Sequence, residues 1–575
     1  MSQTIALIGS GPTAIYSLRR LLSSARPLEI TVFEKEAVAG RGMPYHPAVN
    51  DRAMLANIAS IEIPPICETL VEWLARQPPE ELDRLRVQPA QINDREFLPR
   101  VVLGEYFKAQ FDRVVATGRA AGHTVTIKAG HEVTDVALQR DEIRVTVSRP
   151  DLPPEHHAFG HVIMATGHSF PDLTEVKPGY FASPWPAPLL KGIPAGDVGI
   201  LGTSLSGIDA MVTIATSHGS FYHDEAGLLE YHPASASEGL RISLLSRKGM
   251  LPEADFYFPI PYDPLLICTD EAVDALVASG RDDLLDAVFG LFCKELAAAD
   301  PDYAAKIGLA SLTVETIEAA YFAGREKNDP FLWAALNLAE AKQNYETRTT
   351  VGWRYAILRM HEVVARVVPH LNARDLKRFH SHFKSLFVDD YATVPHASIE
   401  RVLALRRAGV LDIVKLGNDY ELDIDTPARG AIICRPEGTL VFDTLVDATG
   451  QGSLSADEIP FPSLRKQGAV TKASARSEGQ VQIGNQPALE QETGGVALDS
   501  CFRFVVDAPL SNQLYCLALP FLLHQFPFVQ GITSSYELGE TVAAAILASD
   551  DKNLGQMPQV AGASESEQGL ELFVP

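Results

Sequence analysis

Cysteine and basic residues are in short supply in this sequence, and each shortage argues against a class of protein. Only six cysteines occur in 575 residues, and none forms a C-x-x-C pair or stands near a histidine at zinc-ligand spacing. Dithiol disulfide reductases and structural zinc sites are therefore excluded, and we expect no metal. With 49 Lys and Arg against 73 Asp and Glu, the formal net charge is −24. Such a chain lacks the basic stripe that binds nucleic acid, and it is also unsuited to an anionic membrane surface.

Long apolar runs are also scarce. The longest, from Leu514 to Ile532, is interrupted by proline, histidine and glutamine, so we expect a buried strand followed by a loop rather than a membrane span. Met1 leads almost directly into the apolar run Ile5 to Ile8, which ends in glycine instead of a cleavage site. We therefore expect no signal peptide. Unpaired cysteines in a long chain fit a reducing compartment, and the predicted location is the cytoplasm.

A dinucleotide-binding motif opens the chain. The run Ile5 to Ile8 reads as a buried parallel strand, Gly9-x-Gly11-x-x-Ala14 as a glycine turn, and the following residues as a helix. A second predicted strand ends at Glu34, close to the expected distance for an acid that binds the ribose. Gly11 lets the backbone approach a pyrophosphate at the helix N-terminus. A plain turn between strand and helix is the alternative, but the two flanking strands and the acid favour the cofactor site.

The same order of strand, glycine turn and helix begins again near residue 198. The run Val198 to Leu201 reads as a strand, Gly202 to Gly207 as a glycine turn with Ser204 at the middle position, and the following residues as a helix. Both units end in a strand that runs into a Thr-Gly turn, at Ala165-Thr166-Gly167 and at Thr449-Gly450. Before these ends we expect alternating strands, with His123 to Ile127 and Glu142 to Val147 forming a β-meander in the first unit.

Apolar residues at helical spacing fill the stretch between the two halves of the second unit. The predicted fold is α/β, with two Rossmann-like dinucleotide-binding domains, for FAD and NADP, and a large helical insertion. The predicted units are 1–170 and 451–549 for the FAD domain, 190–268 and 408–450 for the NADP domain, 269–407 for the helical insertion, and 550–575 for a disordered acidic tail.

The second predicted strands of the two units end in opposite charges. Glu34 suits the free 2′-hydroxyl of FAD, whereas Ser246-Arg247-Lys248 suits the 2′-phosphate of NADP. A solvated turn is the alternative for the two cations. A basic pair at this position in a chain of charge −24 favours the phosphate site.

With these motifs the sequence resembles two-dinucleotide-domain flavoproteins, and more narrowly bacterial FAD/NAD(P)-binding proteins. It is also similar to flavin-dependent N-hydroxylating monooxygenases, including those that oxidise aspartate toward nitrosuccinate. The resemblance rests on Gly40-Arg41-Gly42-Met43-Pro44-Tyr45, Met54 to Ala59, Phe97 to Arg100 and Ser246 to Pro252, and it covers most of residues 1–545. The Baeyer–Villiger fingerprint is not matched, because Gly179 to Pro186 contains no histidine. Ketone oxygenation is therefore disfavoured.

The resemblance implies an FAD- and NADPH-dependent monooxygenase that hydroxylates the amino group of a small amino acid or amine, aspartate-like, with O2 and through a C4a-hydroperoxyflavin. Two alternatives stay open. One is an NAD(P)H-dependent flavin reductase or dehydrogenase without oxygen insertion, and the other is a non-catalytic flavin-binding scaffold. The expected partners are the small-molecule substrate and O2, without nucleic acid or membrane, and a homo-oligomer stays open.

The candidate residues follow from these motifs and from the resemblance. Asn57, His524 and Gln525 are the candidates beside the reacting part of the flavin, although Asn57 could equally cap a turn. The first unit and its completion supply the FAD candidates Gly9, Gly11, Pro12, Thr13, Ala14, Glu34, Lys35, Gly40, Arg41, Gly42, Tyr45, Asn57, Arg100, Ala165, Thr166, Gly167 and Phe526. The second unit supplies the NADP candidates Gly202, Thr203, Ser204, Ser206, Ser246, Arg247, Lys248, Thr449 and Gly450. Arg100 either serves the FAD pyrophosphate or only pairs with an acid on the surface. For an anionic amino-acid substrate the candidates are Arg52, Arg354 and His396.

Overall fold

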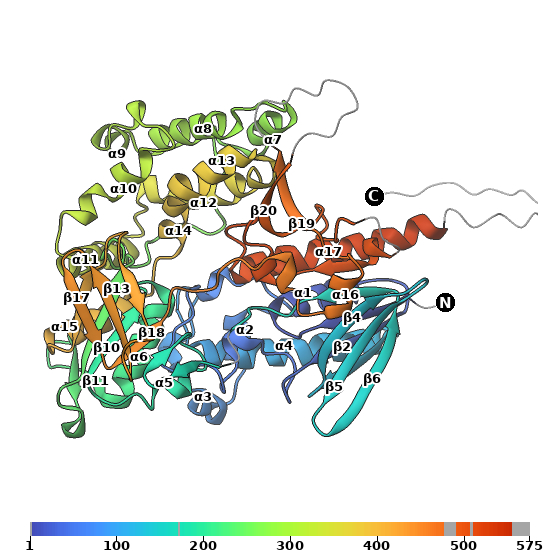
Figure 1. The fold of residues 1–575 in the computed structure, drawn as a ribbon, viewed down its shortest axis with the longest axis horizontal. Helices are drawn as coiled ribbons and strands as arrows, with labels where there is room; N and C mark the ends of the chain where they lie inside the picture. Colours follow the sequence, from blue (N-terminus) through green and yellow to red (C-terminus); the bar gives the residue numbers. More distant parts are fainter. Residues whose placement is uncertain (1–2, 171–172, 477–489, 507–509, 555–575) are drawn as a thin grey trace, which may run out of the picture.

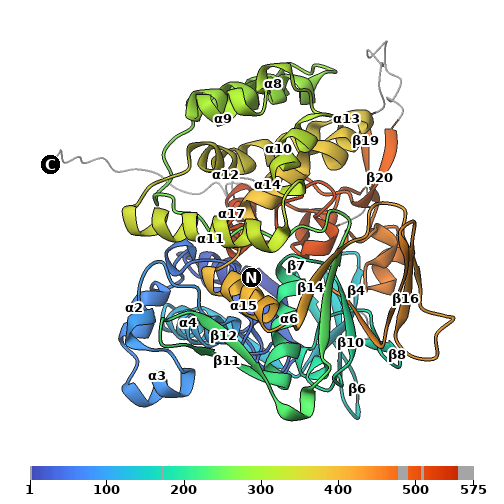
Figure 2. The ribbon, with the colours of Figure 1, turned by 90° about the vertical axis from the view of Figure 1, so that its left-hand side faces the viewer.

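The computed structural model describes residues 3–170, 173–476, 490–506 and 510–554 (Figure 1). Two parallel sheets occupy its lower part, and a layer of helices from the middle of the chain lies across the top (Figures 1 and 2). The predicted class, α/β with two Rossmann-like domains and a helical middle region, is confirmed. No helix among the described residues is both long enough and apolar enough to cross a membrane.

The first dinucleotide unit is built on a five-stranded parallel sheet. In spatial order its strands are β21 (Leu514–Cys516), β7 (His161–Met164), β1 (Gln3–Ile8), β2 (Leu28–Glu34) and β3 (Thr124–Ala129). All five are paired in parallel, with Ile8 opposite Phe33 on one side and Met164 on the other. The predicted return of the chain near residue 514 is therefore correct, because β21 completes this sheet from the far end of the sequence.

The first unit carries helices on its sheet and a small antiparallel sheet beside it. The helices are α1 (Pro12–Leu21), α2 (Leu70–Ala75), α3 (Pro79–Leu85), α4 (Arg100–Ala120), α16 (Pro462–Lys466) and α17 (Ile532–Leu554). The meander consists of β4 (Glu132–Leu138), β5 (Ile143–Arg149) and β6 (Leu152–Phe159). The prediction that His123 to Ile127 starts the meander is wrong. That segment forms β3, where its alternating residues pair with β2 at the end of the parallel sheet.

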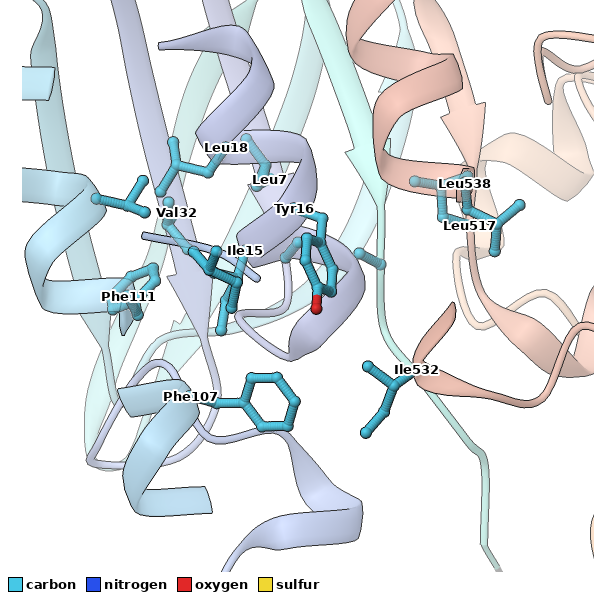
Figure 3. Close-up of a cluster of buried hydrophobic side chains, with 14 of the residues drawn as sticks. Leu7, Ile15, Tyr16, Leu18, Val32, Phe107, Phe111, Leu517, Ile532 and Leu538 are labelled. Carbon is cyan, nitrogen blue, oxygen red and sulfur yellow. The ribbon is translucent and has the colours of Figure 1, made fainter. Parts of the chain in front are cut away.

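The core of this unit lies where α1, α4 and α17 meet the sheet. Figure 3 shows Ile15, Tyr16 and Leu18 of α1 in one cluster with the sheet residues Leu7 and Val32 and with aromatic side chains of α4. Leu538 of α17 closes the cluster from the opposite side. Gly539 allows this approach, because a Cβ there would lie 2.8 Å from the Ser17 nitrogen. The last helix is therefore packed tightly against the first.

The second dinucleotide unit has a six-stranded sheet that is parallel except at one edge. Its strands in order are β14 (Leu411–Lys415), β13 (Arg241–Ser246), β10 (Asp197–Leu201), β18 (Thr444–Asp447), β9 (Tyr180–Phe181) and β8 (Glu175–Lys177). Its other elements are α5 (Ala187–Leu190), α6 (Leu205–His218), the hairpin β11 (Gly219–His223) and β12 (Leu229–Pro233), and the sheet of β15 (Glu421–Asp423), β16 (Ala431–Arg435) and β17 (Gly438–Phe442).

The middle region is helical, as expected. It comprises α7 (Asp270–Ala278), α8 (Leu284–Ala299), α9 (Pro301–Lys306), α10 (Ile317–Glu326), α11 (Pro330–Thr347), α12 (Gly352–Ala365), α13 (Ala373–Arg378), α14 (Lys384–Tyr391) and α15 (His396–Arg407). A hairpin of β19 (Lys472–Arg476) and β20 (Glu490–Val496) stands between these helices and α17 (Figure 1). The predicted domain bounds stay a prediction. Of the predicted tail, residues 550–554 belong to α17 and residues 555–575 lie outside the described residues.

Candidate functional site

The glycine turn of the first unit joins three strand ends. Gly9 has φ = 102°, and its N–H donates to the Phe33 carbonyl at 2.8 Å. A Cβ at Gly9 would lie 2.2 Å from the Ala165 oxygen, so only glycine fits between β1 and β7. The helix α1 begins directly afterwards, with Gly11 at its N-cap and no side chain capping it. Its first N–H groups therefore stay available to a phosphate.

Glu34 is held beside this turn by a residue that the motif leaves unspecified. The Ser10 hydroxyl donates to one Glu34 carboxylate oxygen at 2.6 Å, and the Ser10 N–H donates to the same oxygen at 3.2 Å. The Gly40 N–H in turn donates to the Ser10 hydroxyl at 2.8 Å. Ser10, which is fully buried, thus joins the predicted ribose acid to the next cofactor segment. Only its place inside the turn could have marked it in the sequence.

The segment Gly40 to Tyr45 folds over the glycine turn. A Cβ at Gly42 would lie 2.9 Å from the Gly11 Cα, so two bare backbones face each other there. The Arg41 side chain is held by Glu105 of α4 at 2.9 Å. The Tyr45 ring packs on Phe107 at 5.1 Å. Bare backbone beside an uncapped helix N-terminus fits a dinucleotide pyrophosphate, as the sequence predicts.

The second unit repeats this geometry strand by strand. The Gly202 N–H donates to the Leu245 carbonyl at 2.7 Å, as Gly9 does to Phe33. A Cβ at Gly202 would lie 2.6 Å from the Ala448 oxygen, the counterpart of Ala165. Ser204 is the N-cap of α6, and its side chain makes no capping hydrogen bond. The substitution of serine for the middle glycine therefore leaves this helix N-terminus available as well.

Gly207 ends the predicted second glycine turn, but the sequence analysis did not include it among the NADP candidates. A Cβ at Gly207 would lie 2.3 Å from the Gly202 oxygen. Gly207 therefore occupies the third motif position, where Ala14 stands in the first unit. At the Thr-Gly end of this unit, Thr449 donates from its backbone N–H and its hydroxyl to Asp447, at 3.0 and 2.7 Å.

The predicted NADP cations lie at the position that Glu34 occupies in the first unit. Ser246, Arg247 and Lys248 follow directly after Leu245, just as Glu34 follows Phe33. Arg247 is exposed and has no side-chain partner among the described residues. Lys248 instead forms an ion pair at 2.8 Å with Glu318 of α10.

A cavity of ≈340 Å³ lies where all the units meet. The first unit contributes Met43, Pro44, Tyr45, Ala56, Asn57, Ile58, Glu62, Arg100, His168 and Phe170. The second unit and the segment leading into it contribute Trp185, Leu205, Ser206, Gly450 and Gln451. The helical region and the segment leading into it contribute Tyr262, Leu358, His361, Glu362 and Tyr391. The segment leading into α17 and its first turn contribute Phe528, Gln530, Gly531, Ile532, Thr533 and Ser534.

Two buried polar atoms in the cavity lining have no hydrogen-bond partner among the residues that the structure describes. The Asn57 side-chain oxygen and the His168 Nδ1 are both buried without a hydrogen bond. Buried polar atoms are almost always bonded, so these two are suited to contact a bound molecule. Burial, with Arg100 nearby, lowers the pKa of His168 to about 4, so the ring is neutral at pH 7. The cradle of bare glycines, the uncapped helices and these unpaired atoms together fit FAD.

Arg100 connects the two dinucleotide units instead of standing free. Its guanidinium forms an ion pair with Asp209 of α6 at 2.7 Å, and its Nε donates to the Leu55 carbonyl at 3.3 Å. Burial raises the pKa of Asp209 to about 6, although Arg100 opposes the shift. Arg100 does pair with an acid, but Asp209 is buried between the units and does not lie on the surface, as that alternative expected. Its predicted contact with the FAD pyrophosphate stays a prediction.

The structure does not bring the remaining predicted residues into the cavity lining. His524 is buried against Gly495, and Phe526 packs on Phe502 at 5.2 Å. Gln525 is likewise absent from the lining. The roles proposed for His524 and Gln525 beside the flavin stay predictions.

The three predicted substrate residues are each held elsewhere. Arg52 donates to the carbonyls of Leu85 and Arg86. Arg354 forms a buried ion pair with Glu253, and the His396 ring bonds the Asp255 carbonyl at 2.8 Å. These positions lie outside the lining, which the sequence could not show because their partners are far away in the chain.

Glu62 is the lining residue with the most informative chemistry, and the sequence analysis missed it. One of its oxygens accepts the Ala59 N–H at 2.9 Å. Burial, reinforced by the nearby Asp255, raises the pKa of Glu62 to about 7. A carboxyl with this pKa can accept a proton near neutral pH. Nothing in the segment Ser60-Ile61-Glu62 separates this acid from an ordinary capping glutamate.

Comparisons with known proteins agree with this geometry. Residues 6–169 match the model of the FAD–NAD(P)-binding family, and residues 269–391 match that of the YdhS-like middle domain. The uncharacterised protein YdhS of Escherichia coli (strain K12) is 44% identical over 543 residues, which cover 94% of this chain and 97% of that protein. The prediction of an FAD/NAD(P)-binding protein, with FAD and NAD(P)H as cofactors, is confirmed by these matches.

Two solved structures align with this chain over nearly its whole length. The ornithine N-hydroxylase of Kutzneria sp. 744 aligns with 96% of this chain and 100% of its own, at 12% identity and a TM-score of 0.48. The ornithine hydroxylase of Pseudomonas aeruginosa aligns with 95% of this chain and 99% of its own, at 11% identity and a TM-score of 0.46.

Proposed function

The chain belongs to the YdhS family, and from that premise we propose that it is an NADPH-dependent flavin monooxygenase that hydroxylates the nitrogen of a small amine. The observation that carries the proposal is the cavity shared by both dinucleotide units. Asn57 and Arg100 of the first unit and Ser206 and Gly450 of the second line the same ≈340 Å³ space. A nucleotide at the second glycine turn and a flavin at the first would therefore share one enclosed site.

Asn57 and the first turn of α17 would bind and position the flavin and the substrate. Bound FAD, once reduced, would supply the activation of O2. The Asn57 side-chain oxygen, buried and unpaired, accepts a hydrogen bond from the flavin or the substrate. Ile532 to Ser534, in the first turn of α17, line the same space. Such a helix N-terminus stabilises negative charge on a bound ring.

The helical region gives the cavity its wall against water. Tyr391 and Phe528 pack edge to face at 5.8 Å, and both line the cavity. The His361 ring contacts both aromatic rings, and burial lowers its pKa, so it stays neutral. Aromatic side chains on this side of the cavity would help to keep water from an oxidising site and to limit the release of peroxide.

Glu62 is the proposed proton acceptor. An amine must lose its ammonium proton before its nitrogen can attack an oxidant, and a carboxyl with a pKa of about 7 is matched to that task at neutral pH. Its place in the lining puts it within the space that the substrate would occupy. Burial of the site thus gives Glu62 the pKa that proton transfer at neutral pH requires.

The charge of the lining favours an amine over a dicarboxylate. Among the described lining residues Arg100 is the one arginine or lysine, and it is already paired with Asp209. Glu62 and Glu362 supply negative charge. An aspartate-like substrate, which the sequence resemblance implies, would need a cation that this lining does not offer. A small amine without a second carboxylate is therefore the first substrate class to test.

The test is NADPH oxidation by the FAD-loaded protein in air, screened across amines and amino acids with aspartate included. The expected result is a product heavier by one oxygen atom, formed in proportion to the NADPH consumed. Equal amounts of NADPH oxidised and peroxide released with every compound would indicate a flavin reductase or oxidase and would overturn the proposal. A flavin that NADPH does not bleach would exclude both enzyme readings.

A further inference from the structure

The helical region reaches into the predicted NADP site through α10. Glu318, in the first turn of α10, forms an ion pair with Lys248 at 2.8 Å. The Lys248 ammonium also lies 3.6 Å from the centre of the Phe322 ring on the same helix. Glu326, the last residue of α10, lies farther from the same ammonium, at 4.0 Å. A cation assigned to the nucleotide is thus already engaged by a near carboxylate, a more distant one and an aromatic ring from another part of the chain.

The turn that carries Lys248 lies at the ribose end of the nucleotide site. The Gly202 N–H bonds the Leu245 carbonyl at 2.7 Å, which fixes the start of this turn beside the glycine turn. In dinucleotide units, the residues that follow this strand meet the adenosine ribose and any 2′-phosphate. Lys248 lies three residues beyond Leu245.

A second cation belongs to the same edge of the sheet. Lys415 ends β14 directly opposite Ser246. A Cβ at Gly249 would lie 2.8 Å from the Lys415 Cβ, so the turn folds back over this residue. The side chains of Arg247 and Lys415 have no partner among the described residues, whereas Lys248 has Glu318. The three cations therefore differ in how readily they can meet a phosphate.

We propose that Glu318 competes with the nucleotide 2′-phosphate for Lys248 and thereby sets the preference between NADPH and NADH. The inference rests on the proposed use of NADPH. A 2′-phosphate carries nearly two negative charges, so its approach to Lys248 displaces the Glu318 carboxylate or meets repulsion from it. NADH, which lacks this phosphate, leaves the pair intact.

The attachment of α10 allows this exchange without unfolding the helix. At its far end, Arg325 is buried, bonds the Leu251 carbonyl at 2.6 Å and pairs with Asp389 at 2.5 Å. The Lys248–Glu318 pair is only half-buried, with side-chain exposures of 35% and 23%. The helix is thus fixed at one end, while the carboxylate at the other can leave Lys248 by a change of rotamer.

The experiment measures binding, not turnover. Dissociation constants of NADP+ and NAD+ are determined calorimetrically with the FAD-loaded protein, its Glu318→Gln variant and a control, Glu340→Gln. Glu340 is an exposed acid of α11, so the control removes the same charge from the helical region. Glu318→Gln is expected to tighten NADP+ about three- to tenfold and to leave NAD+ unchanged, since exposed pairs are weak but the phosphate is doubly charged. The control should change neither constant.

The outcomes separate this inference from the proposed function. Unchanged NADP+ affinity in Glu318→Gln would show that the ion pair only joins two parts of the chain. Weaker NADP+ binding would show that Glu318 positions Lys248 for the phosphate. Either result overturns the inference. In the background of Lys248→Gln, Glu318→Gln should have no further effect on NADP+. A parent protein that binds NADP+ no tighter than NAD+ would refute the proposed NADPH preference, yet selective tightening in Glu318→Gln would still support the competition.

Discussion

Replacement of Glu62 by glutamine tests the proposed proton acceptor through two independent measurements. The pKa of Glu62 is about 7, raised from 4.5 by burial and by Asp255. A raised acid pKa means that the folded protein favours the protonated form, so its stabilising contribution is present below the unfolded pKa and is lost as the pH rises through the folded one. The shift corresponds to about 3 kcal/mol, lost between about pH 5 and 8.

Glutamine imitates the protonated carboxyl at every pH. Glu62→Gln should therefore match the parent in stability at pH 5 and exceed it at pH 8, by up to about 3 kcal/mol. Release of flavin fluorescence on unfolding follows the unit that contains Glu62. A stability difference that does not change with pH would refute the buried, protonated carboxyl.

Glu72 offers a matched control. Its carboxylate accepts a hydrogen bond from the N–H of Thr69, three positions earlier, at 2.8 Å, as Glu62 does from Ala59. Glu72 is solvated, however, and its pKa is lowered, mainly by this backbone hydrogen bond. A lowered acid pKa gives stability above the unfolded pKa that is lost as the pH falls. Glu72→Gln should therefore be slightly less stable than the parent at both pH 5 and pH 8, without the gain in stability at high pH that is expected for Glu62→Gln.

Activity supplies the second measurement. In the parent, the hydroxylation rate should fall about tenfold per pH unit below pH 7, because only the ionised carboxyl accepts a proton. In Glu62→Gln the fall in rate below pH 7 should disappear, and the hydroxylation rate at pH 8 should be about 100-fold lower than in the parent. The rate of anaerobic flavin reduction by NADPH should stay unchanged. Asp255→Asn should move the fall in rate to lower pH, since it removes the repulsion that raises the pKa of Glu62. An unchanged pH profile in Glu62→Gln would assign the proton to another group.

Three further substitutions probe the cofactor sites. Gly207→Ala should weaken NADP+ binding at least tenfold, because the new Cβ meets the Gly202 oxygen at 2.3 Å. The control Gly290→Ala, in an open position of α8, should raise the free energy of unfolding by about 0.5–1 kcal/mol. Equal NADP+ binding in both variants would refute the close contact at Gly207. Asn57→Ala should lower coupling of NADPH oxidation to product, measured as peroxide released, and unchanged coupling would leave Asn57 a structural residue. Arg247→Ala should weaken NADP+ about three- to tenfold and leave NAD+ unaffected; an intact preference would remove Arg247 from the site.

The sequence could predict what is encoded locally. Each glycine turn lies between two apolar strands in a single short stretch, so both dinucleotide units and the place of Glu34 follow from spacing alone. The meander was misplaced because alternation in His123 to Ile127 describes β3 equally well. A period of two cannot say which sheet a strand joins.

The cavity could not be read in the same way, because it forms between segments far apart in the chain. Arg100 meets Asp209 only when the two units are assembled. His361 and Glu362 lie in a helix whose pattern resembles that of any packed helix, and their function follows from where α12 is placed. Lys248 shows the same limit: its position follows from the motif, but its partner on α10 does not.

The packing of α17 on α1 has a consequence for how the protein is made. The first sheet is incomplete until β21 pairs with β7, and Leu514 follows Met164 by most of the chain. At ordinary rates of synthesis the ribosome needs roughly 20 to 70 s to cover that distance. Throughout this time the open edge of β7 and the face of α1 that later receives Gly539 stay uncovered. The cofactor cradle that starts at the ninth residue thus becomes complete only when synthesis is nearly over, so we expect flavin capture to be a late event.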